Sequence, residues 1–169
     1  DFANDFAHLH EHAETIRENF EHVIIVGMGG AILNPMAILN SRKSFDDAPM
    51  MHFSNTTDSD KFRSILEKVE LSKTAVLTIS KSGNTMETIA LLACWKQVFE
   101  STSNVDLSKH FYFIVGADAI LNLDSWKSPK DLLKSITFLV GNRPNYPIED
   151  KTIANLFERL PAAIGKIKL

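Results

Sequence analysis

Apolar residues near the start of the chain recur at alternating steps of four and three, which is the spacing of one face of a helix. They are Phe2, Phe6, Leu9, Ala13, Ile16 and Phe20. A short β-branched run, Val23 to Val26, follows at once and ends in Gly27-Met-Gly-Gly30. Apolar residues then continue to Leu39. The pattern predicts a helix over 2–20, a strand over 23–26, a glycine turn and a helix over 31–39.

The same order of strand, turn and helix repeats along the chain. Further β-rich runs cover 51–54, 74–79, 111–115 and 136–140. The short polar side chains of Asn55-Thr-Thr-Asp58 can cap a helix that carries Phe62, Ile65, Leu66 and Val69, and a second, long helix is predicted over 85–99. The second helix is apolar on most of its circumference, so we expect it to be deeply buried, while 101–110 reads as a loop. Five strands alternating with helices predict an α/β fold, a three-layer αβα sandwich with a five-stranded parallel sheet.

The end of the chain predicts one more amphipathic helix. Its apolar positions are Ile153, Leu156, Phe157, Leu160 and Ile164. Pro161 is expected to divide this helix, since proline lacks the N–H that a helix interior needs. A chain of 169 residues without a long linker predicts a single domain over 1–169. Within it we expect an N-terminal helix over 1–22, the core sheet and helices over 23–140, and a C-terminal loop and helix over 141–169.

Composition and charge narrow the classes of partner. Eighteen basic residues against twenty-one acidic ones give a net charge of -3, so no overall positive field attracts nucleic acid or anionic lipid. The stretch Val23 to Ser41 lacks charge, but its glycines and Asn34-Pro35 favour a strand, turn and helix over a membrane span. The single cysteine, Cys94, and a start without the features of a signal peptide predict a cytoplasmic protein with no membrane or nucleic-acid partner.

The richest chemistry lies in the run Thr78-Ile-Ser-Lys-Ser-Gly-Asn-Thr-Met-Glu-Thr88, between the third strand and the long helix. The run carries one positive charge and several hydroxyls, from Lys81 and from Ser80, Ser82 and Thr85. Ligands collect at the carboxyl ends of parallel strands, where helix N-termini offer free N–H groups. These groups suit a phosphate dianion, because charge-assisted hydrogen bonds are about twice as strong as neutral ones. Serine and threonine also cap helices, so a purely structural role is open at this point.

The segment Ser80-Lys-Ser-Gly-Asn-Thr-Met-Glu-Thr88 resembles the signature of sugar isomerase (SIS) domains, and more closely that of the phosphoglucose isomerase family. Val26-Gly-Met-Gly-Gly-Ala-Ile-Leu-Asn-Pro35 is similar to the glycine-rich loop that this family carries after its first strand. Phe53-Ser-Asn-Thr-Thr-Asp58 is similar to the segment after its second strand. The likeness covers Val23 to Ala93 well, and Leu160-Pro-Ala-Ala-Ile-Gly165 resembles a later family segment. It implies the flavodoxin-like strand order 2-1-3-4-5.

The resemblance also implies roles for individual residues. Those matching the family's phosphate ligands are Ser80, Lys81, Ser82 and Thr85, and those matching the sugar side are Gly29 and Gly30. Ala31 stands where the family commonly has a substrate-contacting serine, and Asn34 replaces the usual glycine. Arg143, in Val140-Gly-Asn-Arg143, matches a catalytic arginine that the family carries after a Gly-Gly pair.

Other candidate residues have structural explanations. Glu87 suits the first turn of a helix, where an acid interacts well with the helix dipole, better than it suits a general base. His8 and His12 have the spacing of zinc ligands, but zinc needs three or four ligands and no partner set is evident. We read both tryptophans as core, and we expect no metal and no cofactor.

Two functions follow as expectations. The resemblance implies binding of a phosphorylated sugar such as fructose 6-phosphate or glucose 6-phosphate, as in the isomerase of glycolysis and gluconeogenesis. The family's glutamate base and ring-opening histidine lie in a second SIS domain and the adjoining subunit, so we expect this segment to bind substrate and to need such a domain or a homodimer for catalysis. The alternatives are a non-catalytic sugar-phosphate sensor with the same phosphate site, and a flavodoxin-like fold with an unrelated ligand.

Overall fold

The structure of the chain, a computed structural model, describes residues 2–41, 48–101, 105–141, 150–161 and 167–168. Its strands are β1 (His22–Val26), β2 (Met50–Ser54), β3 (Thr74–Ser80), β4 (Phe111–Gly116), β5 (Thr137–Gly141) and β6 (Ile167–Lys168). Its helices are α1 (Phe2–Asn19), α2 (Gly30–Ser41), α3 (Ser59–Leu66), α4 (Met86–Ser101), α5 (Leu107–His110), α6 (Ala117–Ile120), α7 (Pro129–Ser135) and α8 (Asp150–Arg159), with short 3-10 turns at Leu71–Lys73 and Leu123–Ser125.

The strands form one parallel sheet in the order β2-β1-β3-β4-β5-β6. This confirms the predicted α/β class and the order 2-1-3-4-5. Within the described ranges the sheet has six strands rather than five, because Ile167–Lys168 adds a short strand beside β5. A strand of two residues is too short to produce a hydrophobic period in the sequence.

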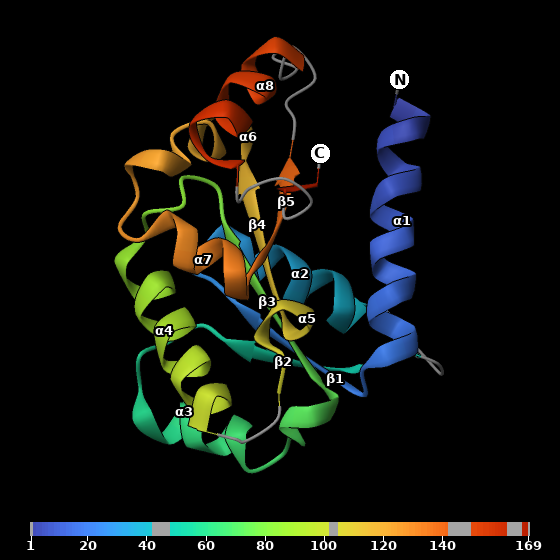
Figure 1. The fold of residues 1–169 in the computed structure, drawn as a ribbon. Helices are drawn as coiled ribbons and strands as arrows, with labels where there is room; N and C mark the ends of the chain where they lie inside the picture. The colour runs from blue at the N-terminus through green and yellow to red at the C-terminus, as the bar shows by residue number, and fades with distance from the viewer. Residues whose placement is uncertain (1, 42–47, 102–104, 142–149, 162–166, 169) are drawn as a thin grey trace.

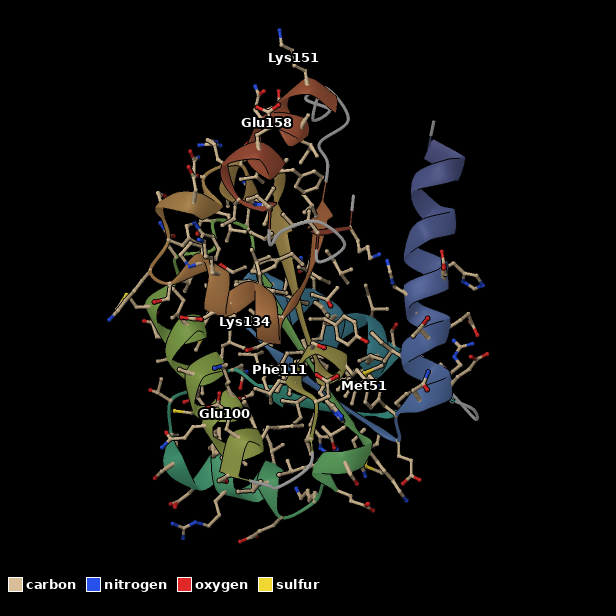
Figure 2. All side chains as sticks on the ribbon, in the orientation of Figure 1. Met51, Glu100, Phe111, Lys134, Lys151 and Glu158 are labelled. Atoms are coloured by element: carbon tan, nitrogen blue, oxygen red, sulfur yellow. The ribbon has the colours of Figure 1, made fainter. Side chains whose placement is uncertain are left out.

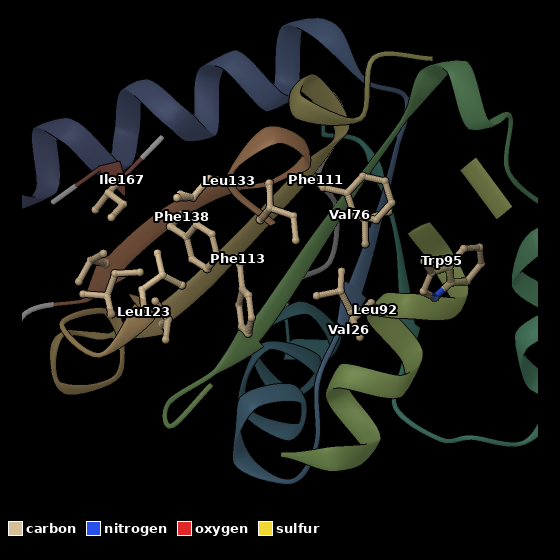
Figure 3. Packing of buried hydrophobic residues seen from close by; sticks show 14 of the residues in the cluster. Val26, Val76, Leu92, Trp95, Phe111, Phe113, Leu123, Leu133, Phe138 and Ile167 are labelled. Carbon is tan, nitrogen blue, oxygen red and sulfur yellow. The ribbon is translucent and has the colours of Figure 1, made fainter. Parts of the chain in front are cut away.

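Both faces of the sheet are covered, which makes the fold three-layered. Alternate residues of each strand point to opposite faces, so Val76 and Phe113 face one side while Ala75 and Tyr112 face the other. The first side carries the larger core, with α3, α4, α6, α7 and α8, and the second carries α1 and α2. In Figure 1, α4 and α7 lie on the opposite side of the sheet from α1. Figure 3 shows the larger core running across the strands from Val26 to Ile167.

The helix α4 is buried along one face only, which corrects the expectation that it is deeply buried all round. Its inner residues Leu91, Trp95 and Phe99 are buried, whereas Ile89 is 40% exposed and Cys94 is also exposed. No described element covers the outer face, so its apolar residues there remain at the surface. An apolar helix in a sequence does not reveal which of its faces has a neighbour.

The second half of the chain contains more helix than expected. The predicted loop 101–110 ends in α5, and α6 and α7 fill the connection between β4 and β5. These helices have seven residues or fewer, too few to display a full apolar period.

The amphipathic pattern from Ile153 is confirmed as α8, whose charged side chains Lys151 and Glu158 face outward in Figure 2. This helix ends at Arg159, before Pro161, and residues 162–166 lie outside the described residues, so the expected division by proline stays a prediction. None of the helices in the described ranges is long and apolar enough to span a membrane.

Candidate functional site

The site begins at the carboxyl end of β3, in the middle of the sheet, where Ser80 ends the strand. Ser80 is 4% exposed, and its Oγ accepts a hydrogen bond from the N–H of Gly83 at 3.1 Å. Lys81 and Ser82 are exposed at the tip of the turn. The carbonyl of Thr85 accepts from the N–H of Ile89 at 3.0 Å, which is the first bond of α4. The turn therefore holds its lysine and hydroxyls at the N-terminus of a helix, where the dipole favours an anion.

Two contacts from the neighbouring β4 connection fix the shape of this turn. Gly83 has φ +70°, a left-handed conformation that glycine adopts without strain, and a Cβ there would lie 2.5 Å from the ring of Trp126. The N–H of Gly116 donates to the carbonyl of Lys81 at 3.2 Å. The backbone of the turn is therefore held by a hydrogen bond at Lys81 and by packing against an indole ring at Gly83.

Two buried hydroxyls lie at the two ends of the turn. Thr78 is 0% exposed and Thr88 is 1% exposed, and neither Oγ1 has a hydrogen-bond partner among the described residues. Thr78 lies on the same face of β3 as Val76, which is the face that α4 covers. Buried polar groups without partners are rare, and each calls for an explanation. Among the described residues, hydrogen-bonding capacity is therefore left unused at both ends of the turn.

The glycine turn after β1 lies beside the first turn, because β1 pairs with β3. Gly29 has φ +54°, and its carbonyl accepts the first bond of α2 from Leu33 at 2.9 Å. A Cβ on Gly27 would lie 3.0 Å from the carbonyl oxygen of Ile79, so glycine permits the two turns to approach closely. Gly29 and Gly30 are both exposed at the start of α2. The residues predicted for the phosphate and for the sugar therefore come from adjacent strands at one edge of the sheet.

A cavity of about 650 Å³ opens beside the turn, on its β4 side. It is lined by Lys81, Ser82, Asn84, Asp118, Ala119, Asn122, Ser125 and Trp126. The last five come from the connection between β4 and β5, and the sequence pointed to none of them as a site residue. Trp126 is half-buried and forms part of the wall, so its assignment to the core was only partly right. The one available signal was topological: the segment after β4 must lie next to the segment after β3.

The remaining candidate residues add little to the description of the site. Arg143 lies outside the described residues. Glu87 is an exposed acid in the first turn of α4, which agrees with its predicted structural role. The side chain of His8 is likewise outside the described part, and the described residues contain no cluster of three metal-ligating side chains.

Comparisons with known proteins agree with the motifs. The family model described as "Phosphoglucose isomerase" matches residues 7–120. A probable glucose-6-phosphate isomerase of Methanococcus maripaludis is 35% identical over 114 residues, which cover 65% of this chain and 26% of that relative. A glucose-6-phosphate isomerase of Methanocaldococcus jannaschii is 43% identical over 70 residues, covering 41% of this chain and 17% of the relative. The chain thus spans about a quarter or less of the length of these curated relatives.

Solved structures show the same fold. A glucose-6-phosphate isomerase from Chlamydia trachomatis superposes with a TM-score of 0.63 at 24% identity, covering 68% of this chain and 22% of that one. A hypothetical protein from Thermus thermophilus superposes with a TM-score of 0.64 at 19% identity, covering 83% of this chain and 32% of that one. At these identities the likeness establishes the fold alone.

Proposed function

Because the chain belongs to the phosphoglucose isomerase family, we propose that it binds the phosphate of a sugar phosphate at the turn after β3. The proposed phosphate ligands are Ser80, Lys81, Ser82 and Thr85, with Gly29 and Gly30 on the sugar side. The observation that carries this proposal is the position of one lysine and several hydroxyls at the N-terminus of α4, on the central part of the sheet. In an open parallel sheet, ligands bind at the carboxyl ends of the strands, and the turn after β3 lies there.

The turn offers an anion both charge and hydrogen-bond donors. Lys81 is exposed and has no ion-pair partner among the described residues, so its charge is available to a ligand. The hydroxyl of Ser82 donates to Oδ1 of Asn84 at 2.6 Å, and a phosphate oxygen would take the place of that acceptor. The Oγ of Ser80 accepts from Gly83, which leaves its own hydrogen free to donate. The turn is therefore preorganised around donors.

The sugar phosphate we propose is fructose 6-phosphate or glucose 6-phosphate, since the two curated relatives described above carry the name glucose-6-phosphate isomerase. Aldose–ketose isomerisation needs a base that moves a proton next to the carbonyl and an electrophile that stabilises the developing oxyanion. We assign the electrophile to Arg143. The base and the ring-opening group come from a second SIS domain or a second copy in a homodimer, and the 169-residue segment is a single domain that binds substrate without completing the reaction.

A non-catalytic sugar-phosphate sensor is the second candidate, and two residues favour it. Ala31 is half-buried at the start of α2 and has no hydroxyl for a substrate. Asn34 lies one turn further on, with its Nδ2 3.9 Å from where a Cβ on Gly30 would be. Its amide makes the sugar side of the site bulkier than a glycine would. For either function we place the protein in the cytoplasm, without nucleic-acid or membrane partners.

Titration calorimetry with fructose 6-phosphate tests the binding site. Replacing Lys81 and Thr85 together by alanine should weaken binding at least about tenfold, because each charge-assisted hydrogen bond contributes roughly 1.5–3 kcal/mol. The matched control is Lys109→Ala, which removes the same charge from an exposed position in α5, at the amino end of β4. Absence of sugar-phosphate binding, or equal affinity in the double variant, would refute the phosphate site.

An isomerase assay separates the two candidate functions. The full-length protein should interconvert fructose 6-phosphate and glucose 6-phosphate, whereas this segment alone should bind the sugar phosphate and leave it unchanged. A full-length protein that binds but does not turn over the sugar phosphate would establish the sensor instead.

A further inference from the structure

A second cavity, of about 430 Å³, lies between α3 and α4, away from the turn after β3. It is lined by Thr57, Ser59, Phe62, Arg63, Leu66, Ala90, Leu91 and Cys94. Its volume is in the range of cavities that hold small molecules. None of the residues proposed for the sugar phosphate takes part in it.

The aromatic floor of this cavity is the ring of Phe62, which a buried tryptophan holds from behind. The ring of Phe62 packs on Trp95 with ring centroids 4.2 Å apart. Trp95 is 0% exposed, and its Nε1–H donates to Oγ of Ser54 at 3.1 Å, which fixes the indole. Figure 3 shows Trp95 on α4 at the margin of the larger core. A rigid aromatic floor favours a flat apolar group lying on it.

Small side chains on α4 provide the space. Ala90 and Cys94 are four residues apart, so they lie on the same face of the helix, and both are exposed. The side chain of Leu91 closes the inner wall. Larger residues at these two positions would fill the gap between α3 and α4.

The rim of the cavity is polar and positively charged. Arg17 and Arg159 each pair with a carboxylate, but Arg63 has no ion-pair partner among the described residues. Thr57 and Ser59 add hydroxyls that likewise have no partner in the described ranges. A guanidinium beside an apolar floor is a site for a carboxylate, because its planar fork matches that group.

We propose that this cavity, lined by Phe62, Ala90, Cys94 and Arg63, binds a small amphipathic anion: a flat apolar body that lies on the Phe62 ring, with a carboxylate that Arg63 holds. The site is separate from the phosphate turn and goes beyond the proposed function. Loss of one site leaves the other intact.

Cys94, the only cysteine of the chain, reports on occupancy. The measurement is the rate at which iodoacetamide, a neutral reagent, alkylates Cys94 in the presence of 2-naphthoate or of its neutral isostere 2-naphthamide. A ligand of this size should saturate the site at about millimolar concentration. We expect 2-naphthoate to slow the alkylation saturably, with an affinity about three- to tenfold higher than that of 2-naphthamide.

Two matched pairs of variants locate the effect. Arg63→Gln should abolish the preference for the anion, whereas Arg17→Gln, which removes the same charge from α1, should keep it. Ala90→Leu should prevent protection by filling the cavity, whereas Ala93→Leu, on the exposed face of α4 but outside the cavity, should not. Far-ultraviolet circular dichroism verifies that each variant is folded.

The proposal is overturned if naphthoate gives no saturable protection, if the amide protects as well as the anion, or if either pair of variants behaves alike. Lys81→Ala should leave the protection of Cys94 unchanged while weakening sugar-phosphate binding. This variant therefore separates failure of the cavity from failure of the phosphate site.

Discussion

Two glycines of the site adopt left-handed backbone conformations, but only one of them is also crowded. Gly83 has φ +70° and would place a Cβ 2.5 Å from Trp126, whereas Gly29 has φ +54° with nothing within 4 Å of its Cβ. Gly29→Ala should cost only backbone strain, about 1 kcal/mol of unfolding free energy. Gly83→Ala should cost about 1–3 kcal/mol more, because the ring must move. Urea unfolding of both variants measures the difference.

The Trp126→Leu background isolates the steric part of this effect. There the two glycine substitutions should cost nearly the same, since the ring that opposes a Cβ at Gly83 is gone. A difference that persists in the leucine background would place the cost of Gly83→Ala elsewhere in the turn.

A histidine pair on the adjacent strands β1 and β2 should make stability depend on pH. Nδ1 of His22 and Nε2 of His52 are 3.2 Å apart. Burial, the charge of His22 and the charge of Lys68 hold the pKa of His52 below its ordinary value of 6.5. The folded state therefore takes up a proton less readily than the unfolded chain, so this contribution to stability is complete above about pH 6.5 and is lost as the pH falls below that value.

We expect the unfolding free energy to decrease from pH 7.5 to pH 5.5, and His52→Gln to reduce that decrease. Chemical denaturation at both pH values measures it. Protonation of carboxylates also lowers the unfolding free energy as the pH falls, in wild type and variant alike. Only the difference between the two proteins therefore reports on His52. An equal decrease in the two proteins would show that His52 does not carry the effect.

At the scale of residues, the sequence identifies chemistry within a continuous run and misses what packs against it. The hydroxyls and lysine of the Ser80–Thr85 run are adjacent in the chain, so their proximity was predictable. Trp126, which fixes the turn, lies more than forty positions later, and neither its spacing nor its type indicates that it meets Gly83. Such contacts follow only from the order of strands in the sheet.

At the scale of elements, one buried hydrogen bond links α4 to β2. Trp95 on α4 donates to Ser54, the last residue of β2, which is 3% exposed. Trp95→Phe leaves the Ser54 hydroxyl without this donor, and Ser54→Ala leaves the indole N–H without this acceptor. Each change should lower the unfolding free energy by about 1–3 kcal/mol.

The double variant tests whether the two side chains act together. Its cost should be smaller than the sum of the single costs by about 0.5–1.5 kcal/mol, because the bond can be lost only once. Equilibrium unfolding followed by circular dichroism gives the three values. Strictly additive costs would show that the bond adds nothing beyond the packing of each residue.

How well the sequence predicts a helix or strand depends on the length of that element. The strands of the first half and α4 are long enough to show their period, and they were predicted to within one or two residues. The short helices α5 to α7 and the strand β6 were missed, since they are stabilised by tertiary packing rather than by a pattern of their own. The exposed outer face of α4 was missed for a related reason: hydrophobicity alone does not show where neighbours end.

At the scale of the whole molecule, the strand order follows from the repeated strand–turn–helix unit, together with the family likeness. Parallel strands joined by right-handed crossovers place the turns after β1 and β3 next to each other. This adjacency makes two separate motifs into one candidate site. The identity of the sugar does not follow in the same way, because a fold holds different ligands in different families.

Local stability should follow the position of each strand in the sheet. The central strands β3 and β4 are paired on both sides and covered on both faces, whereas in the described part of the chain β2 and β6 are edge strands, each paired with one neighbour. Amide hydrogens of the central strands exchange only when much of the sheet opens, while edge strands exchange by smaller openings. We expect the amides of 76–79 and 113–115 to exchange slowest among the strands and those of Ile167–Lys168 fastest. Hydrogen exchange followed by nuclear magnetic resonance at two pH values measures these rates and establishes that they reflect equilibrium openings. If the amides of β2 or β6 exchanged as slowly as those of β3, the sheet would open as a single unit and this gradient of stability would not exist.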